Sequence, residues 1–273
     1  MPELPEVETI VRGLRELITD RIIEEVVVRE ERLLAFPSVE KFKKGLRKKI
    51  INGVERRGKY ILLRVDETKT LIIHLRMTGR LLLKPREMKY DKHTHIIFEL
   101  DNDLDLRFHN IRKFGRIYLV ENNYEAVGGF NKLGPEPLAD DFTYELFREM
   151  INSRKSNIKA LLLDQSFLAG LGNIYTDEAL FHAHISPERS SNSLEEKEIR
   201  ALYNSIRKVL QEGIESGGTS FSDYRNVDDK KGNYQNHLCV YQKEGKECIN
   251  CGAEIIKKKI TGRGTHYCPQ CQK

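Results

Sequence analysis

Two pairs of cysteines near the end of the chain place the strongest constraint on how it can fold. Cys248 and Cys251 form one Cys-x2-Cys pair, and Cys268 and Cys271 form the other, with sixteen residues between the two pairs. This spacing is typical of a four-thiolate zinc site, because each pair can place two sulfurs on one side of the metal. Disulfides are the alternative, although the rest of the sequence suggests a reducing compartment.

The stretch between the two pairs, residues 253–266, is expected to form a β-hairpin with its turn near residues 262–264. Cys239 is the fifth cysteine. It lies among apolar residues and is expected to be a buried structural thiol. One structural Zn²⁺ with four cysteine ligands is therefore the expected cofactor.

Length and composition predict a folded, two-domain protein. The chain has 273 residues, of which 39% are hydrophobic and 32% charged. No apolar run reaches the roughly 18 residues that a membrane span needs. The acidic N-terminus does not resemble a signal peptide. We expect a cytoplasmic monomer with no membrane partner.

Positive charge is clustered, although the net charge is only +5. Residues 41–86 contain fifteen Lys/Arg and three acids, and residues 231–273 contain eight Lys/Arg and three acids. Such clusters suit a polyanion such as nucleic acid. A solvated face of an ordinary protein is the alternative for either cluster alone.

The apolar pattern changes along the chain. Helical spacing indicates a helix over residues 5–18 and another near 38–48. Short β-like runs separated by turns then predict an antiparallel sandwich or barrel. The expected strands are residues 22–28, 60–65, 70–75, 80–83, 95–100, 104–108 and 116–120. A linker with Gly and Pro follows, and helices are expected at 142–151, 158–163, 174–182 and 194–215.

The N-terminal residues Pro2 and Glu3 form a possible reactive pair. If Met1 is removed, Pro2 carries a free secondary amine, which can attack a carbonyl-like carbon and form an iminium. The adjacent Glu3 carboxyl group can move the proton that this reaction needs. The alternative is that these residues only lead into the first helix, which Pro5 suits at its first turn.

Three internal motifs could bind DNA, and each has an ordinary structural alternative. Asn173 is a favourable N-cap, and free amides at such a helix start can hold a phosphate. Arg112 and Phe114, with Met77, could fill a gap in stacked bases, although core packing explains the two apolar residues equally well. Lys59 could hold a phosphate or simply lie at a strand edge.

Taken together, the motifs resemble the bacterial formamidopyrimidine-DNA glycosylase family, which excises oxidised purines. The resemblance extends from residue 2 to residue 271 and is jointly specific. Its motifs are Pro2-Glu3-Leu4-Pro5-Glu6, Gly58-Lys59-Tyr60, His74-Leu75-Arg76-Met77, Arg112-Lys113-Phe114-Gly115, Leu133-Gly134-Pro135-Glu136-Pro137-Leu138, Leu163-Asp164-Gln165, Gly170-Leu171-Gly172-Asn173-Ile174-Tyr175, Gly262-Arg263-Gly264-Thr265 and the four cysteines.

The resemblance implies an α+β fold. An N-terminal β-sandwich with flanking helices (residues 1–130) is followed by a linker (131–138), a helix–two-turn–helix domain with a lesion-capping loop (139–236) and a zinc hairpin (237–273). It also implies a base-excision DNA glycosylase/AP lyase. The enzyme would act on double-stranded DNA that contains 8-oxoguanine, formamidopyrimidines or abasic sites, and would be associated with the bacterial nucleoid.

The resemblance further implies residue roles. Pro2 would be the nucleophile and Glu3 the acid/base residue. Lys59 and Arg263 would also belong to the catalytic site, where they contact phosphates around the lesion. The DNA-binding residues would be His74, Met77, Arg112, Phe114, Asn173 and Tyr241, of which His74 and Asn173 would also contact those phosphates.

Three positions depart from the usual family pattern: Asn110, Ser222 and Gln242 replace a common Asp, a basic residue and a Gly. Two alternative functions also remain. An endonuclease VIII-like enzyme would prefer oxidised pyrimidines, although Leu4 and Arg112-Lys113-Phe114 favour the purine branch. A non-catalytic zinc-ribbon DNA-binding protein would need neither Pro2 nor Glu3.

Overall fold

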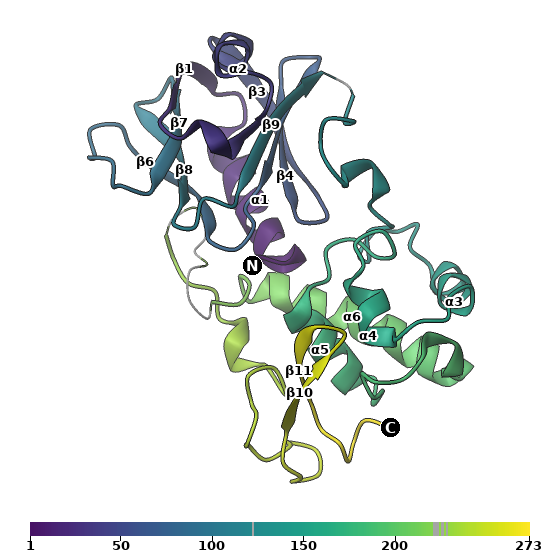
Figure 1. The fold of residues 1–273 in the computed structure, drawn as a ribbon. Coiled ribbons are helices and arrows are strands. Elements are labelled where there is room, and N and C mark those ends of the chain that lie inside the picture. The colour runs from purple at the N-terminus through teal and green to yellow at the C-terminus, as the bar shows by residue number, and fades with distance from the viewer. Residues whose placement is uncertain (122, 221–223, 225–226, 228) are drawn as a thin grey trace. The chain divides into compact units, whose positions relative to one another are not determined.

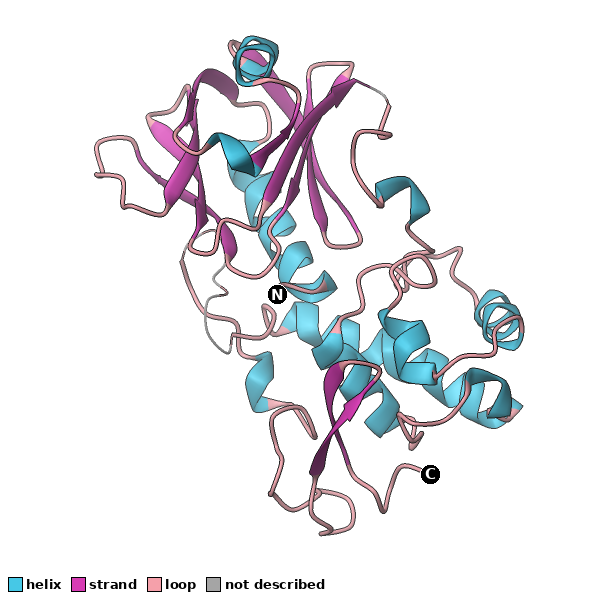
Figure 2. Cartoon of the chain, viewed as in Figure 1, coloured by secondary structure: helices cyan, strands magenta, loops and turns pink. Residues whose placement is uncertain are grey.

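The computed structural model describes residues 1–121, 123–220, 224, 227 and 229–273. The chain divides into two compact units (Figure 1). The first unit combines Met1–Asn131 with Ser216–Asn233, and the second combines Lys132–Glu215 with Tyr234–Lys273. Strands dominate the first unit and helices the second (Figure 2). The long segment after residue 215 thus belongs with the N-terminal unit, although it follows the helices in sequence.

The first unit contains two α-helices and nine strands among the described residues. In chain order these are α1 (Leu4–Ile18), β1 (Ile22–Val28), β2 (Leu34–Phe36), α2 (Val39–Leu46), β3 (Lys49–Arg57), β4 (Tyr60–Val65), β5 (Lys69–His74), β6 (Gly79–Pro85), β7 (Thr94–Leu100), β8 (Leu104–Asn110) and β9 (Arg116–Glu121). β2 and β3 were not predicted, and several other strands differ by one or two residues from the predicted bounds.

The strands form a sheet in the order β2-β9-β5-β4-β3-β1-β7-β8-β6. Among the described strands, the two halves of the sheet are joined by the short β1–β3 pairing, Ile22 with Ile50 and Ile23 with Lys49. Side chains from both halves meet in one hydrophobic core, so the sheet is a sandwich. Among the described strands, β2 and β9 pair in parallel, which corrects the purely antiparallel prediction.

Helix α1 closes this core. Its apolar residues recur at helical spacing and are completely buried: Val7, Ile10, Val11, Leu14 and Ile18. They belong to the same buried hydrophobic cluster as Ile61 and Leu63 of β4. Burying one such side chain contributes about 1.5–3 kcal/mol, so the stripe holds the start of the helix firmly in place. The N-terminus therefore lies on a rigid element.

The second unit contains four α-helices and a hairpin among its described residues: α3 (Tyr144–Asn152), α4 (Ile158–Leu163), α5 (Asn173–His182), α6 (Glu196–Glu215), β10 (Ile256–Ile260) and β11 (Arg263–Tyr267). Helices α5 and α6 approach closely at Gly213, where an added Cβ would lie 2.6 Å from the ring of Tyr175. Tyr175 also stacks on Tyr234, with ring centroids 5.3 Å apart. This buried aromatic pair connects the helices to the segment that leads to the hairpin.

The hairpin turn is Thr261-Gly262, because Ile260 pairs with Arg263 across the strands. The turn therefore lies one residue earlier than predicted. Both turn residues have positive φ, 46° and 82°, which matches the two-residue turn that suits twisted strands. The predicted architecture is confirmed: a β-sandwich with flanking helices, then a helical part with a cysteine-bearing hairpin. No helix among the described residues combines the length and apolar character that a membrane span needs.

Candidate active site and nucleic-acid interface

The reactive pair proposed at the N-terminus lies at the start of α1. Pro2 and Glu3 are buried, whereas Met1 is half exposed. Glu3 is the N-cap and forms a capping box with Glu6: the backbone N–H of Glu3 donates to Glu6 Oε2 at 2.8 Å, and the Glu3 side chain accepts from the backbone of Glu6. Pro2 and Glu3 therefore lead into the helix, as the alternative predicted, and remain placed together as a possible reactive pair.

Glu6 has a second role that the sequence did not reveal. Its Oε1 accepts the backbone N–H of Thr219 at 2.7 Å, and Tyr224 donates its hydroxyl to Glu6 O at 3.4 Å. Gly218 has φ +81°, and an added Cβ there would lie 2.9 Å from Glu6 Cγ. Glu6 thus fixes the start of the predicted capping loop beside Glu3. Ser222 of that loop lies outside the described residues.

The N-terminus opens into a pocket that contains the predicted wedge. Met1, Arg76, Met77, Phe114 and Arg116 line this pocket, which has a volume of about 420 Å³. Met77 is 46% exposed and Phe114 is 49% exposed. Core packing, the alternative for both residues, is therefore wrong. Two large apolar side chains are thus exposed in the same pocket as Met1, the residue before the buried Pro2-Glu3 pair, and are available to a ligand.

Arg112 joins these two side chains. Its Nη1 lies 3.1 Å from Met77 Sδ, and its guanidinium carbon lies 4.8 Å from the centre of the Phe114 ring. The backbone N–H of Arg112 donates to Thr78 Oγ1 at 3.0 Å, and that hydroxyl donates to Asn110 Oδ1 at 3.1 Å. Asn110 is completely buried and acts on Arg112 through Thr78. Asn in place of the family's usual Asp therefore removes a negative charge from the buried hydrogen bonds that hold the backbone of Arg112.

Two backbone positions beside the wedge are in the left-handed region. Arg76 has φ 55° and Lys113 has φ 54°, which costs a non-glycine residue about 1–2 kcal/mol. Lys113 Nζ also pairs with Glu30 at 2.6 Å, a contact that the sequence did not predict. Arg32 and Lys113 together lower the pKa of Glu30 to about 2, so this anchor is ionised at pH 7.

His74, the last residue of β5, offers an N–H group, and Lys59, in the turn between β3 and β4, offers a positive charge. Burial, with the charges of Arg76 and Lys59, lowers the pKa of His74 to about 3, so its ring is neutral at pH 7. His74 Nδ1 accepts the backbone N–H of Arg76 at 3.0 Å, which assigns the remaining proton to Nε2. His74 can therefore donate to an anion without carrying charge. Lys59 follows Gly58, whose φ is 54° in the turn before β4.

In the second unit, Asn173 is the first residue of α5 and Gly172 is the N-cap, which corrects the predicted N-cap role of Asn173. The Asn173 amide instead donates from Nδ2 to Gly264 O at 2.9 Å. That contact connects the helix N-terminus to the hairpin strand that begins with the exposed Arg263. Asn173 therefore lies close to Arg263, because it binds the residue that follows Arg263 in the chain.

A buried ion pair fastens the same hairpin to the helices. Lys159 of α4 and Asp177 of α5 are both completely buried, and their charged atoms lie 2.6 Å apart. Lys159 also donates to Thr265 Oγ1 at 2.7 Å and to Gly264 O at 3.3 Å. Asp177 Oδ2 accepts the backbone N–H of His266 at 3.0 Å. This pair could not be predicted from the sequence, because its members lie on different helices.

We expect Lys159→Met to be strongly destabilising. It leaves the Asp177 carboxylate buried without its counter-charge, which costs about 3–5 kcal/mol. Calorimetry should show the melting temperature of the second unit lowered by about 10 °C. Adding Asp177→Asn should recover part of the loss, because the amide oxygen can still accept from His266. Lys155→Met, on an exposed lysine, should change stability by less than about 0.5 kcal/mol; equal effects at both lysines would contradict the assignment.

The four terminal cysteines gather as the spacing predicted. All four sulfurs lie within 4.8 Å of one another. The Cys248–Cys271 and Cys251–Cys268 sulfurs are 3.8 and 3.5 Å apart. Four thiolates around a tetrahedral Zn²⁺ at about 2.3 Å have sulfurs about 3.8 Å apart, so the donors fit this ion. With four protein ligands the site has no open position for a reacting water, and the metal is structural.

Tyr241 lies between Glu178 and the hairpin. Its backbone N–H donates to Glu178 Oε1 at 2.8 Å, and its ring meets the His266 ring edge-on with centroids 5.0 Å apart. Gln242 follows with φ 58°, a conformation that glycine adopts without strain. Gln242 therefore occupies a conformation that favours glycine, at a cost of about 1–2 kcal/mol.

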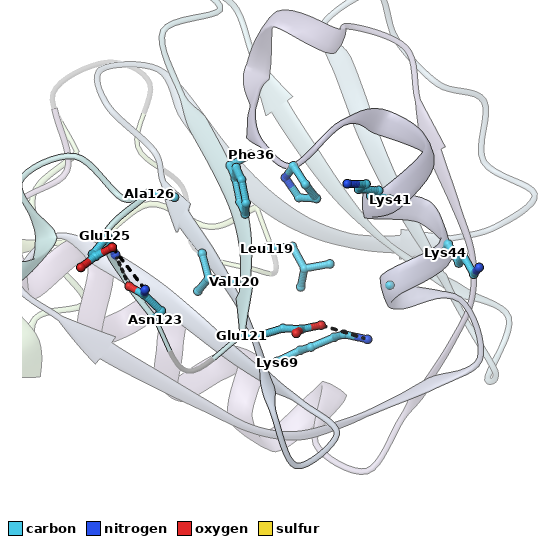
Figure 3. Close-up of a pocket in the computed structure, with 12 residues that line it drawn as sticks. Phe36, Lys41, Lys44, Lys69, Leu119, Val120, Glu121, Asn123, Glu125 and Ala126 are labelled. Atoms are coloured by element: carbon cyan, nitrogen blue, oxygen red, sulfur yellow. Dashed lines mark hydrogen bonds and ion pairs between the residues drawn. The ribbon is translucent and has the colours of Figure 1, made fainter.

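A separate pocket of about 680 Å³ also lies in the first unit (Figure 3). Phe36 and Leu119 line it with apolar surface, Lys41 and Lys44 lie on α2, and Lys69 pairs with Glu121 at 3.9 Å. None of the predicted site residues lines it. It therefore has no part in the site described above, but its half-exposed Phe36 provides a control for Phe114.

Comparison with known proteins identifies the class. Residues 1–117 match the family model for the formamidopyrimidine-DNA glycosylase N-terminal domain, residues 133–225 its H2TH domain, and residues 245–273 the zinc finger found in FPG and IleRS. A formamidopyrimidine-DNA glycosylase of Heliobacterium modesticaldum is 49% identical, with 100% of each chain covered.

Two solved structures are similar to this chain over its whole length. A Lactococcus lactis FPG mutant in complex with a Fapy-dG containing DNA has a TM-score of 0.93 at 41% identity, with 100% of each chain covered. The wild-type L. lactis protein in complex with an oxidised-pyrimidine containing DNA has a TM-score of 0.91, at the same identity and coverage. The fold and the site define a base-excision DNA glycosylase with a zinc finger. Within that class, the chain belongs to the formamidopyrimidine-DNA glycosylase family.

Proposed function

We propose that this enzyme excises oxidised purines from double-stranded DNA and cuts the strand at the resulting site. The observation that supports this most strongly is the pocket at the N-terminus. There the exposed Met77 and Phe114 lie beside the residue that precedes the buried Pro2-Glu3 pair. A nucleophile for a sugar and apolar side chains that replace a missing base are the two needs of an enzyme that flips its target out of the duplex.

In the proposed reaction, the free Pro2 nitrogen attacks C1′ of the damaged nucleotide. The base leaves with the electrons of its glycosidic bond and takes up the proton that the Pro2 nitrogen releases. Glu3 protonates the ring oxygen, which opens the sugar and leaves an iminium between C1′ and the proline nitrogen. The iminium acidifies the C2′ proton. Loss of that proton expels the 3′ phosphate, and a second elimination expels the 5′ phosphate. The helix start and the Glu3–Glu6 capping box support this assignment by holding both groups rigidly.

DNA contacts are proposed for residues of both units. Lys59 and Arg263 would neutralise phosphates, and neutral His74 would donate from Nε2. Asn173 would donate its second amide N–H at the start of α5, where the helix dipole favours an anion. Tyr241, which lies beside His266, would contact the DNA strand. The basic clusters at residues 41–86 and 231–273 support a binding affinity that falls steeply with salt.

The division into a catalytic sandwich (1–130), linker (131–138), helical domain (139–236) and zinc hairpin (237–273) stays a proposal. So do the monomeric state and a location on the bacterial nucleoid in the cytoplasm. The last follows from chromosomal DNA as substrate.

Phe114→Ala should separate lesion binding from general DNA binding. Loss of a base-stacking ring costs about 1–3 kcal/mol, so we expect about tenfold weaker binding to a lesion duplex and little change on undamaged duplex. Fluorescence anisotropy on matched duplexes measures both. The control is Phe36→Ala, which removes a ring of similar exposure, 45% against 49%, elsewhere in the first unit. If Phe114→Ala weakens both duplexes equally, Phe114 is not a wedge.

Borohydride trapping tests the function as a whole. Duplexes that carry either 8-oxoguanine or an oxidised pyrimidine are incubated with enzyme and reductant, and the covalent adduct is quantified. We expect an adduct that forms faster on 8-oxoguanine. Faster trapping on the pyrimidine would favour the endonuclease VIII-like alternative. DNA binding without any adduct would favour a non-catalytic zinc-ribbon protein.

A further inference from the structure

A second group of metal-ligand side chains lies in the second unit, apart from the four terminal cysteines. Glu178 and His182 are on α5, and Cys239 is on the segment that leads to the hairpin. One ligand atom from each side chain lies within 4.8 Å of the others. Glu178 and Cys239 are buried and His182 is partly exposed, so the cluster is enclosed but can be reached from solvent.

The distances suit a borderline-soft divalent ion. Cys239 Sγ and His182 Nε2 are 3.8 Å apart. A thiolate and an imidazole on one tetrahedral zinc ion, at about 2.3 and 2.1 Å, lie about 3.6 Å apart. The pair therefore needs to close by only a few tenths of an ångström. Sulfur with nitrogen favours Zn²⁺ or a similar transition metal over Mg²⁺ or Ca²⁺.

Glu178 has one coordination position left. Its Oε1 accepts the backbone N–H groups of Val240 and Tyr241, and its Oε2 accepts that of Cys239. An ionised carboxylate offers about four acceptor positions, so Oε2 retains one. These three bonds also fix the direction of the carboxylate, as hydrogen bonds from outer groups do at metal sites.

The charges balance as well. A divalent cation with one thiolate, one carboxylate and a neutral imidazole forms a neutral group, which avoids the cost of an uncompensated buried charge. Cys239 also belongs to the small apolar core that contains Phe181, Cys248 and Cys268. An ion here would therefore connect the end of α5 to the segment that carries Tyr241.

We propose that Glu178, His182 and Cys239 form a second transition-metal site, distinct from the structural zinc and able to take Zn²⁺ or Co²⁺ when these are supplied. The thiol proton of Cys239 is released to solvent when the ion binds. The fourth ligand is water, admitted on the partly exposed His182 side.

Cobalt titration of the full-length, zinc-loaded protein tests this. Co²⁺ bound to a thiolate absorbs intensely in the near ultraviolet, and an indicator dye reports any zinc released. We expect a thiolate–cobalt band that saturates at one added equivalent per chain, without zinc release. Cys239→Ser should abolish the band. His182→Gln should weaken Co²⁺ binding by more than about 100-fold, beyond what loss of an outer-sphere partner costs.

Two controls separate the site from its neighbours. His184→Asn alters a nearby exposed histidine whose φ of 58° asparagine tolerates, and it should leave the titration unchanged. Circular dichroism and strand cutting without added metal should be the same for Cys239→Ser and the wild type, so a lost band cannot reflect misfolding. No band in the wild type at 100-fold excess Co²⁺, or a band that survives Cys239→Ser and follows zinc release, overturns the proposal.

Discussion

A chain that retains Met1 is expected to form no covalent adduct with abasic-site DNA and to cut it at least ~10³-fold more slowly than the processed chain. With Met1 present the Pro2 nitrogen is an amide, whose lone pair is delocalised and cannot form an iminium. Pro2 is also buried behind the half-exposed Met1. The free amine of a retained Met1 belongs to the preceding residue and does not replace the Pro2 nitrogen next to Glu3. Borohydride trapping and gel analysis of strand cutting measure both effects.

The matched control is the same protein after methionine aminopeptidase treatment, which frees Pro2 without changing any other residue. Trapping and cutting should both return. Binding to an uncleavable abasic-site analogue should differ by less than a few-fold between the two forms, because the wedge and the phosphate contacts are intact. Full cutting activity in a chain shown by mass spectrometry to keep Met1 would exclude Pro2 as the nucleophile.

Zinc removal is expected to unfold the hairpin and to weaken DNA binding by at least ~10²-fold, while helices α3–α6 stay folded. The apolar core around the cysteines is small. Besides cysteines, its fully buried members are Phe181, Val240 and Ile255. Structural zinc contributes roughly 10–16 kcal/mol in isolated fingers, more than such a core can replace. Arg263 and the lysines of β10, Lys257–Lys259, lose their fixed positions with the hairpin.

Hydrogen exchange of the hairpin amides, before and after chelation, measures the unfolding, and anisotropy measures binding. Added zinc should restore both. Cys251→Ser should reproduce the effect of chelation, whereas Cys239→Ser, at the one cysteine outside this cluster, should not. Retained DNA binding in protein shown by elemental analysis to contain no metal would disprove the structural role of zinc.

Much of the fold could be predicted because local patterns decide it. The strands β1 and β4 and the helix α4 have the predicted bounds, since their apolar runs are bounded by clear turn signals. β3 was missed because its sequence, KIINGVERR, alternates weakly and is rich in charge. It forms a strand because it pairs with β4 over six residue pairs and because its apolar side chains pack in the same cluster as those of α1. β2 is only three residues long and exists through its parallel pairing with β9.

The candidate site divides in the same way. Residues whose chemistry is unusual at their position were predictable, such as a proline next to the initiator methionine or cysteines in two spaced pairs. Residues that act by contact with distant segments were not. Glu6 meets Thr219, which lies 213 positions away in sequence, and the importance of Lys159 depends on Asp177 and Thr265.

By itself, the sequence determined which groups are present and which local structures form. These are the Pro2-Glu3 pair, the helix that follows it, the cysteine spacing and the charge clusters, all set by residue chemistry and by interactions within a few positions. Only the tertiary structure decided that Met77 and Phe114 are exposed beside the N-terminus, that His74 is neutral, and that Asn173 contacts the hairpin. Burial and hydrogen-bond partners set those properties, and both depend on segments that come together only when the chain has folded.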